Sequence, residues 1–247
     1  MADLDDLIRY LDELLDPAAF EDIGPNGLQV PGTRPVERVA TGVTAQLELI
    51  ERAVEEGAQL VLVHHGLFWE FAPLGLTPRL AARLRALFMN DVALAAYHLP
   101  LDAHPEVGNN ALLAEALGAA GHVAFAGIGR GATFEEPLPA AELFERVAAA
   151  TGREPLVFDA GPQAVRRVAI VSGGAAGRLD QAIAEGYDAF ITGEPKENVM
   201  ADAREAGIHF VAAGHYATET FGVRRLGDLL ADRFGLEHIW IDIPNPV

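Results

Sequence analysis

Apolar residues recur along the chain with two different spacings, which predict alternating helices and strands. Residues 2–15 carry leucine and isoleucine side chains on one helical stripe, and Pro17 follows as a helix stop. The segment 22–32 is rich in Gly, Pro and Asn and is expected to be a loop. In the rest of the first half we expect strands at 36–43, 58–66 and 92–98 and helices at 45–57, 77–91 and 108–118.

The second half of the chain shows the same alternation. Helices are expected at 140–152, 176–186, 199–207 and 220–235, and strands at 154–161, 165–174, 187–194, 209–215 and 238–246. Several of these strands are continuous apolar runs, as in parallel strands that helices cover on both faces. The pattern therefore predicts an α/β fold with three layers, α/β/α, and largely parallel strands.

The two halves of the chain also resemble each other in sequence. Residues 36–66 align with 165–195 at a constant shift of 129, and residues 94–118 align with 211–235 at a shift of 117. Two blocks in the same order favour an internal duplication over chance similarity between helices. We therefore expect one unit built from two intertwined, pseudo-symmetric α/β halves, at about 1–122 and 123–247.

The composition excludes several classes of protein and site. A net charge of −18 argues against a broad nucleic-acid surface, which would need Lys and Arg, although it is compatible with a nucleotide in a local pocket. There are no cysteines, so any metal must be held by His, Asp and Glu. No uncharged apolar run approaches the length of a membrane span, and the acidic N-terminus lacks the features of a signal peptide. We expect a cytoplasmic protein without a membrane partner.

Two adjacent histidines, His64 and His65, end the apolar run LVLV. Adjacent side chains on a strand point to opposite faces, so both reach one site only where the strand ends and the chain turns. In α/β sheets, ligands bind at the carboxyl ends of the strands. The alternative is a pair of loop histidines, one of them hydrogen-bonded, and the pair by itself favours that alternative.

Two further strand ends carry a histidine followed four residues later by a carboxylate. His98 and Asp102 stand in YHLPLD, His215 and Glu219 stand in GHYATE, and the two pairs match each other in the repeat. If the turn after each strand is helical, residues i and i+4 lie on one face. With the HH pair, these residues exceed the ligands of one zinc and suit two metals about 3.5–4 Å apart with a bridging carboxylate. Such ligands favour Zn, Mn, Fe or Ni over Ca.

Other chemistries have weaker signals. Ser172 is the only serine and lies outside a G-x-S-x-G motif, so a serine hydrolase is not expected. The turn SGGAAG could present N–H groups to a phosphate, but a tight turn packed around its glycines explains it at least as well. The remaining histidines are expected to be surface or hydrogen-bonded structural residues: His104, His122, His209 and His238.

Several blocks of the sequence, taken in order, resemble one known family. They are PNGLQV, TGVTA, LVLVHHGLFW, YHLPLDAHPEVGNN, DAFITGE, AAGHYATE and IDIPNP. Over essentially its whole length the chain is similar to the GTP cyclohydrolase I type 2 homologues, in their short bacterial form. The same family is also described as dinuclear-metal-centre hexameric proteins, or NGG-one-interacting-factor-three-like proteins.

The resemblance implies a metal centre and an assembly. It implies two divalent ions, Fe, Mn, Zn or Ni, held by His64, His65, Asp102, His215 and Glu219, with Glu219 as the bridge. It also implies a toroidal homohexamer whose metal sites face an internal cavity.

Two residues are expected to handle protons beside such a centre. His98 would line the site, and Glu194 is the only candidate after the TGE block, where many members of the family carry a histidine. The favoured function is a metal-dependent hydrolase of a small, nucleotide-like substrate, similar to a GTP cyclohydrolase type 2. Two alternatives stay open: non-catalytic metal storage or delivery, and an interaction scaffold that metals stabilise.

Overall fold

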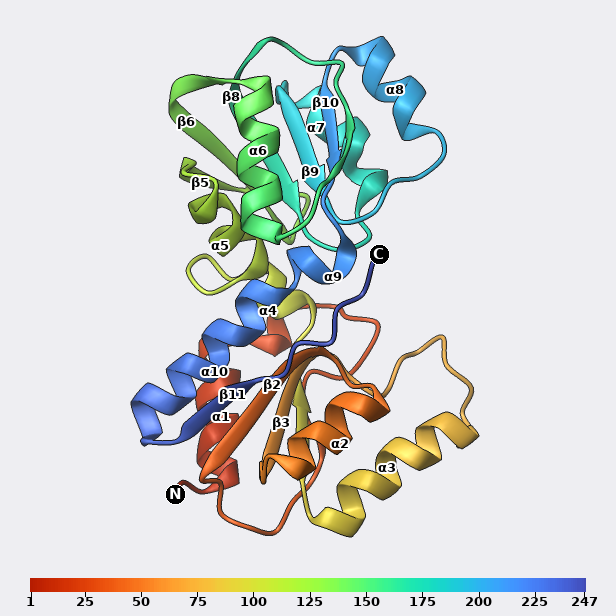
Figure 1. Ribbon diagram of the computed structural model, residues 1–247, viewed down its shortest axis with the longest axis vertical. Helices are drawn as coiled ribbons and strands as arrows, with labels where there is room; N and C mark the ends of the chain where they lie inside the picture. The colour runs from red at the N-terminus through yellow and green to blue at the C-terminus, as the bar shows by residue number, and fades with distance from the viewer. The chain divides into compact units, whose positions relative to one another are not determined.

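The computed structural model describes residues 1–247, apart from the side chain of His122, and divides the chain into two compact units (Figure 1). Unit 1 comprises Met1–Leu101 and Gly222–Ile243, and unit 2 comprises Asp102–Phe221 and Pro244–Val247. The C-terminal helix and strand therefore return to the N-terminal sheet. Among the helices of the described residues, none has the length and apolar content that a membrane span requires.

Unit 1 is built around a five-stranded sheet with the strand order β1-β4-β3-β2-β11. Strands β4, β3, β2 and β11 run parallel, and β1 pairs antiparallel with β4 at one edge. The strands are β1 (Gly27–Val30), β2 (Arg38–Thr44), β3 (Leu60–His65), β4 (Ala93–Ala96) and β11 (Glu237–Trp240). The helices are α1 (Leu4–Leu15), α2 (Leu47–Glu55), α3 (Pro78–Asn90) and most of α10 (Thr220–Phe234), with a 3-10 turn η1 (Pro17–Ala19).

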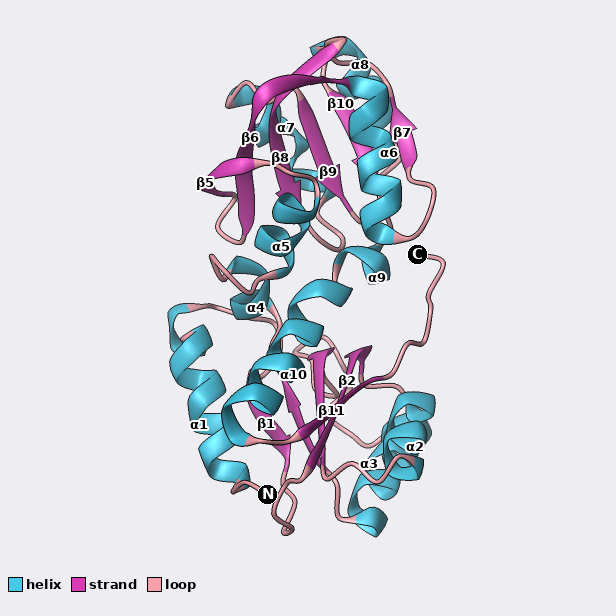
Figure 2. Ribbon diagram, turned by 60° about the vertical axis from the view of Figure 1, so that its left-hand side comes forward, coloured by secondary structure: helices cyan, strands magenta, loops and turns pink.

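Helices cover both faces of this sheet. Alternate strand residues, such as Val61 and Val63, pack with Leu49 and Ile50 of α2 and Leu87 of α3 in one buried cluster. Helices α1 and α10 lie against the other face (Figure 2). Their buried leucines recur at helical spacing, as the sequence pattern predicts. Unit 1 is thus a three-layer α/β/α arrangement.

Unit 2 contains a six-stranded sheet with the order β5-β6-β8-β9-β10-β7. Its central strands β8, β9 and β10 run parallel, and β5, β6 and β7 pair antiparallel on either side. The strands are β5 (Ala120–Phe125), β6 (Gly129–Pro139), β7 (Leu156–Phe158), β8 (Ala164–Val171), β9 (Ala189–Thr192) and β10 (His209–Ala212). The helices are α5 (Asn109–Ala116), α6 (Ala140–Thr151), α7 (Leu179–Ala184), α8 (Val199–Ala206) and α9 (His215–Thr218), with a 3-10 turn η2 (Ala176–Arg178).

Two separate apolar clusters fill the faces of the second sheet. Helices α5 and α6 supply Leu113 and Leu143 to the cluster on one face, and α7 and α8 supply Leu179 and Val199 to the other. The α/β class and its layers are therefore confirmed. The parallel arrangement holds throughout the first sheet except at β1, and only in the centre of the second.

The strand registers of the two sheets repeat closely. Val39 pairs with Leu60 in unit 1, and Val168 pairs with Ala189 in unit 2, so β2–β3 and β8–β9 are related by the shift of 129 seen in the sequence. The next strand follows a different shift, because Leu60 pairs with Ala93 whereas Ala189 pairs with His209. That shift is 116 rather than 117, so His215 stands one residue further beyond its strand than His98. The duplication itself, with halves at about 1–122 and 123–247, stays a prediction.

Two features of the fold differ from the sequence prediction. The segment 22–32, expected to be a loop, contains the edge strand β1. Its four residues are too few to show a strand period, and Pro25 and Pro31 lie on either side of it. The hairpin β5–β6 was not predicted either. Its strands are interrupted by glycines, and its turn contains Gly127 with a φ of +83°.

Candidate metal centre

The two histidines of β3 lie at the carboxyl end of the strand, as predicted. His64 is completely buried and His65 is half-buried, and their ring centroids are 4.7 Å apart. The Nδ1 atom of His64 lies 2.9 Å from the backbone oxygen of Tyr97. Because a carbonyl only accepts, this nitrogen carries the proton, and Nε2 retains the lone pair that a metal needs.

His98 follows β4 and precedes the short helix α4 (Leu99–Ala103). Its backbone N–H donates to Oδ1 of Asn26, and its Nδ1 lies 2.7 Å from Oδ1 of Asp22. Burial alone would raise the pKa of Asp22, but hydrogen bonds from His98, Asn26 and the N–H of Leu99 outweigh it and lower the pKa to about 2. Asp22 is therefore ionised at neutral pH, and it fixes the ring of His98 with Nε2 available as an acceptor.

Three histidines of unit 1 form a compact donor cluster. One ring nitrogen each of His64, His65 and His98 lies within 4.8 Å of the others. Trp69 borders this cluster, with its ring edge-on to His98 at a centroid distance of 5.2 Å. Converging imidazoles in a largely buried position are donors that suit a divalent first-row transition metal. The side chains of unit 1 therefore fit a metal ion.

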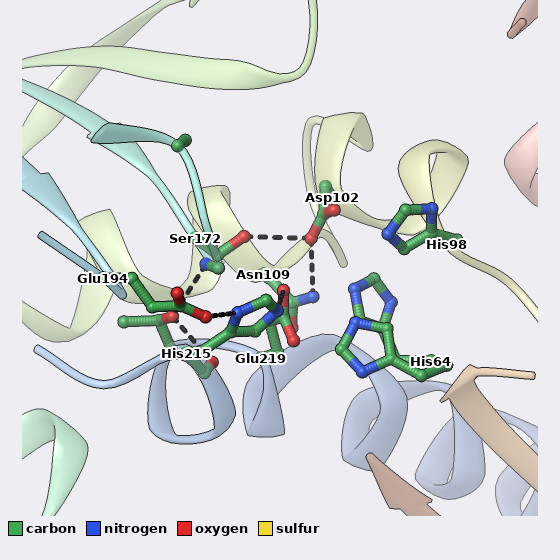
Figure 3. Close-up of polar contacts among 12 residues, drawn as sticks. His64, His98, Asp102, Asn109, Ser172, Glu194, His215 and Glu219 are labelled. Carbon is green, nitrogen blue, oxygen red and sulfur yellow. Dashed lines mark hydrogen bonds and ion pairs between the residues drawn. The ribbon is translucent and has the colours of Figure 1, made fainter. Parts of the chain in front are cut away.

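Asp102 begins unit 2 and is held on both sides. Its Oδ1 accepts hydrogen bonds from Nδ2 of Asn109 at 2.8 Å and from Oγ of Ser172 at 2.9 Å (Figure 3). The side chain is only 4% exposed. Two neutral donors on one oxygen orient a carboxylate without neutralising it, which is the arrangement typical of a buried metal ligand.

His215 and Glu219 lie on and just after α9, in unit 2. Nε2 of His215 is 3.1 Å from Oε1 of Glu219, and its Nδ1 pairs with Glu194 on the opposite side of the ring (Figure 3). Burial alone would lower the pKa of His215, but the two carboxylates reverse the effect and raise it to about 9. The two carboxylates thus favour the protonated ring, and metal binding by His215 would release that proton.

The turn after β8 passes close to these two side chains. Gly173 has a φ of +67°, and a Cβ atom there would lie 2.3 Å from Oε1 of Glu219. The positive φ favours glycine, and a side chain here would also displace the carboxylate of Glu219. Three N–H groups of this turn already donate within the protein: Ser172 to Asn110, Gly173 to Thr218 and Ala175 to Thr192. The tight-turn interpretation of SGGAAG thus accounts for it better than a phosphate cradle.

The two carboxylates stand where the chain passes from one unit to the other. Leu101 is the last residue of the first segment of unit 1, and Asp102 begins unit 2. The second segment of unit 1 begins at Gly222, and Glu219 stands three residues before it. The helix α4 also carries the chain from His98 to Asp102.

The remaining histidines are used structurally, apart from one whose side chain lies outside the described residues. His209 contacts the N–H of Gly161 and the oxygen of Pro162, and His238 contacts Thr41 and Asp228. Nδ1 of His104 accepts from the N–H groups of Glu106 and Val107. His122 is the exception. These contacts confirm the structural assignment for His104, His209 and His238.

Sequence reasoning missed the residues that hold the predicted site residues in place. Asp22 orients His98, and Asn109 and Ser172 orient Asp102. Their signal in the sequence is weak, since Asp22 stands 76 residues from His98 and Ser172 stands 70 residues from Asp102. Asn109 offered a better signal, as an amide seven residues after Asp102 at the start of a predicted helix.

The fold and these side chains define an α/β protein whose units each carry candidate His, Asp or Glu metal ligands. The family model described as Duf34/NIF3 (NGG1p interacting factor 3) matches residues 2–246. The chain therefore belongs to the Duf34/NIF3 family, and the family resemblance seen in its sequence blocks is confirmed.

Relatives with names and structures agree with this assignment. A Pseudomonas aeruginosa protein named GTP cyclohydrolase 1 type 2 homolog is 48% identical, and the match covers 98% of each chain. An Escherichia coli K12 protein of the same name is 44% identical, again over 98% of each chain. The solved structure of TTHA1606 from Thermus thermophilus is similar with a TM-score of 0.93 and 41% identity, covering 99% of this chain and 100% of that one.

Proposed function

We propose that the chain is a dinuclear, divalent-metal-dependent hydrolase of a small nucleotide-like substrate. The proposed ligands of two Fe, Mn, Zn or Ni ions are His64, His65, Asp102, His215 and Glu219. The observation that carries the proposal is the cluster of His64, His65 and His98 in unit 1, whose ring nitrogens converge within 4.8 Å. Converging imidazole nitrogens at the ends of strands are a donor set that suits a divalent transition metal.

The positions of the carboxylates along the chain support a single centre. Asp102 directly follows the first segment of unit 1, and α4 ties it to His98. Glu219 stands just before the chain returns to unit 1 at Gly222. Both carboxylates are thus held near the places where the chain links the two units. A duplication with halves near 1–122 and 123–247 would explain a feature that both halves share. In each half a strand is followed by a histidine and, four residues later, by a carboxylate.

The chemistry expected of such a centre fits the surrounding residues. When bound, two metal ions would lower the pKa of a water molecule toward neutrality and polarise the substrate. Glu219, buried and acceptor-only, is the proposed bridging ligand. His98, whose Nδ1–H is held by Asp22, offers Nε2 as a proton acceptor. Glu194, which pairs with Nδ1 of His215, is the second proposed proton acceptor.

The nucleotide-like substrate is supported by relatives rather than by geometry. The Pseudomonas aeruginosa and Escherichia coli relatives carry the name GTP cyclohydrolase 1 type 2 homolog. We extend that substrate class to this chain as part of the proposal. The proposal also includes a toroidal homohexamer in the cytoplasm, which the resemblance supports and light scattering at several protein concentrations would test. A mass of one chain, 26.3 kDa, at all concentrations would contradict the assembly.

Turnover by metal-loaded protein on a nucleotide panel that includes GTP tests the proposal. Glu219→Ala removes the proposed bridge, and Glu145→Ala, an exposed residue on α6, is the matched control. We expect turnover by the wild type and the control, and a loss of at least about a hundredfold in Glu219→Ala, since bridging-ligand loss removes metal-assisted catalysis. Equal activity in all three proteins would refute the proposal.

A further inference from the structure

Arg130, near the start of β6, is a buried cation with no counterion among the described residues. The residue is 8% exposed. Its Nη2 atom is enclosed by protein and has no hydrogen-bond partner among the described residues. Burial lowers the pKa of its guanidinium. Buried charges are normally paired, because removing a guanidinium from water without compensation is costly. The N–H donors on Nη2 are therefore left unpaired within the described residues.

Arg130 lies near the end of the second sheet at which Ser172 holds the candidate ligand Asp102. Strand β6 runs antiparallel to β8, and Arg130 pairs with Ile170. Strand β8 ends one residue later, at Val171, and Ser172 then donates to Asp102. Arg130 therefore lies within about one strand repeat of the carboxyl end of β8.

The side chain of Arg130 stands on the face that α5 covers. Cross-strand partners share a face of a sheet, and Ile170 belongs to the apolar cluster that α5 and α6 complete. Helix α5 begins at Asn109, and its N-cap residue, Gly108, provides no side-chain hydrogen bond. Asn110 joins this helix start to both strands, since its side chain accepts from the N–H of Ser172 and donates to the oxygen of Ile128.

We propose that Arg130, together with the N-terminus of α5, forms an anion subsite in unit 2 that takes a phosphate group of the substrate. A guanidinium presents a planar set of donors that matches phosphate oxygens bidentately. The positive end of a helix dipole adds to this preference for an anion. The inference rests on the proposed function for the nature of the substrate, but phosphate binding itself needs no turnover.

The subsite explains how a chain of net charge −18 can bind a phosphorylated molecule. A local cation that no described carboxylate pairs with provides attraction that the surface as a whole lacks. It also predicts selectivity, since a nucleoside without phosphate leaves Arg130 unpaired. The phosphorylated form is therefore the better ligand.

Three proteins compared in phosphate-free buffer test the subsite: the wild type, Arg130→Met and Arg130→Lys. Calorimetry measures binding of guanosine and GMP, and thermal unfolding is recorded with and without inorganic phosphate. We expect GMP to bind roughly ten- to a hundredfold more weakly to Arg130→Met, with guanosine binding unchanged, as for a lost charge-assisted pair. Arg130→Lys keeps the charge without the planar fork, so its loss should be smaller.

Stability and metal content separate a binding role from a structural one. We expect Arg130→Met to unfold at the same temperature as the wild type or above it, because an unpaired buried charge is removed. Inorganic phosphate should raise the unfolding temperature of the wild type but not of Arg130→Met. GMP affinity within twofold of the wild type in both variants would overturn the inference, as would a phosphate-induced rise preserved in Arg130→Met. If Arg130→Met does not fold, Arg130→Lys decides by the same readouts.

The same experiment distinguishes failure of the subsite from failure of the proposed function. If the protein binds GMP through Arg130 but turns over no nucleotide, the subsite stands and the hydrolase proposal falls. If nucleotides are hydrolysed while Arg130→Met binds GMP normally, the hydrolase proposal stands and the subsite falls. Metal content is measured in each variant, and we expect it to equal that of the wild type.

Discussion

Asp22 is predicted to stabilise unit 1 by holding His98 and the start of α4. Its carboxylate accepts four hydrogen bonds, from the N–H of Ile23, Nδ2 of Asn26, Nδ1 of His98 and the N–H of Leu99. Asp22→Asn keeps the shape of the side chain but replaces one oxygen by a donor. At least one of the four donors then loses its acceptor.

The magnitude follows from the pKa and from the geometry. The side chain of Asp22 is 3% exposed, so solvent screening is slight. The pKa falls from 3.8 to about 2, which corresponds to about 2 kcal/mol of stability at neutral pH. An orphaned buried donor adds about 1 kcal/mol or more. We therefore expect Asp22→Asn to lower the free energy of unfolding by about 3 kcal/mol at pH 7.

The effect should depend on pH in a defined direction. Because the pKa of Asp22 is lower in the folded chain than in the unfolded one, its ionisation contributes fully only above the ordinary value of 3.8. The contribution fades as the pH falls toward 2, and roughly half of it remains at pH 3. The difference between wild type and Asp22→Asn should therefore shrink by about 1 kcal/mol between pH 7 and pH 3.

Urea unfolding of metal-stripped protein, followed by tryptophan fluorescence, measures this difference. Both tryptophans, Trp69 and Trp240, belong to unit 1, so the signal reports the unit that contains Asp22. The control is Asp232→Asn, an exposed residue on α10, which should change stability by less than about 0.5 kcal/mol. A loss below about 1 kcal/mol in Asp22→Asn, or a difference that is constant from pH 7 to pH 3, would refute the reasoning.

Three other perturbations have clear expected outcomes. Gly173→Ala puts a side chain at a strained φ and displaces the carboxylate of Glu219, so it should lower the unfolding free energy by about 1 kcal/mol and reduce metal uptake. Wild-type values of both would contradict this reasoning. Tyr97→Phe removes the hydroxyl that donates to Asp12 at 2.7 Å and should cost about 1 kcal/mol in urea unfolding, whereas a neutral change would show that the bond adds nothing. Chelation by EDTA should lower the unfolding temperature, and adding metal back should raise it again to a plateau. An unchanged temperature after chelation would argue against bound metal.

The fold could be predicted from the sequence wherever apolar spacing was long and regular. The strands that became β2, β3, β8 and β9 are apolar runs next to helices with regular apolar spacing. The shift of 129 between their sequences is also the shift between the β2–β3 and β8–β9 registers. The edge strand β1 escaped prediction because it is short, half-exposed and enclosed by glycine and proline. An edge strand pairs with only one neighbouring strand, so its unpaired side imposes fewer constraints on its sequence.

The candidate site divides in the same way. His64, His98 and His215 could be found because each follows an apolar strand, and Asp102 and Glu219 follow two of them at helical spacing. The residues that orient these side chains could not be found, because their contacts depend on how loops distant in sequence pack together.

Arg130 is a case of a different kind. In the sequence it is one of seventeen arginines, placed between two glycines, and only its burial without a counterion in the described part of the chain singles it out. The one-residue offset at β10 is likewise visible only in the structure. The strand register there shifts by 116 residues, whereas the sequence repeat shifts by 117.

Metal stoichiometry of the purified chain tests the central claim most directly. Elemental analysis by mass spectrometry should find two divalent transition-metal ions per chain after equilibration and removal of free metal. His65→Ala and Glu219→Ala should each hold fewer than two ions, while Glu145→Ala should match the wild type. Less than one ion per chain in the wild type, or equal content in all four proteins, would contradict a dinuclear centre built on these ligands.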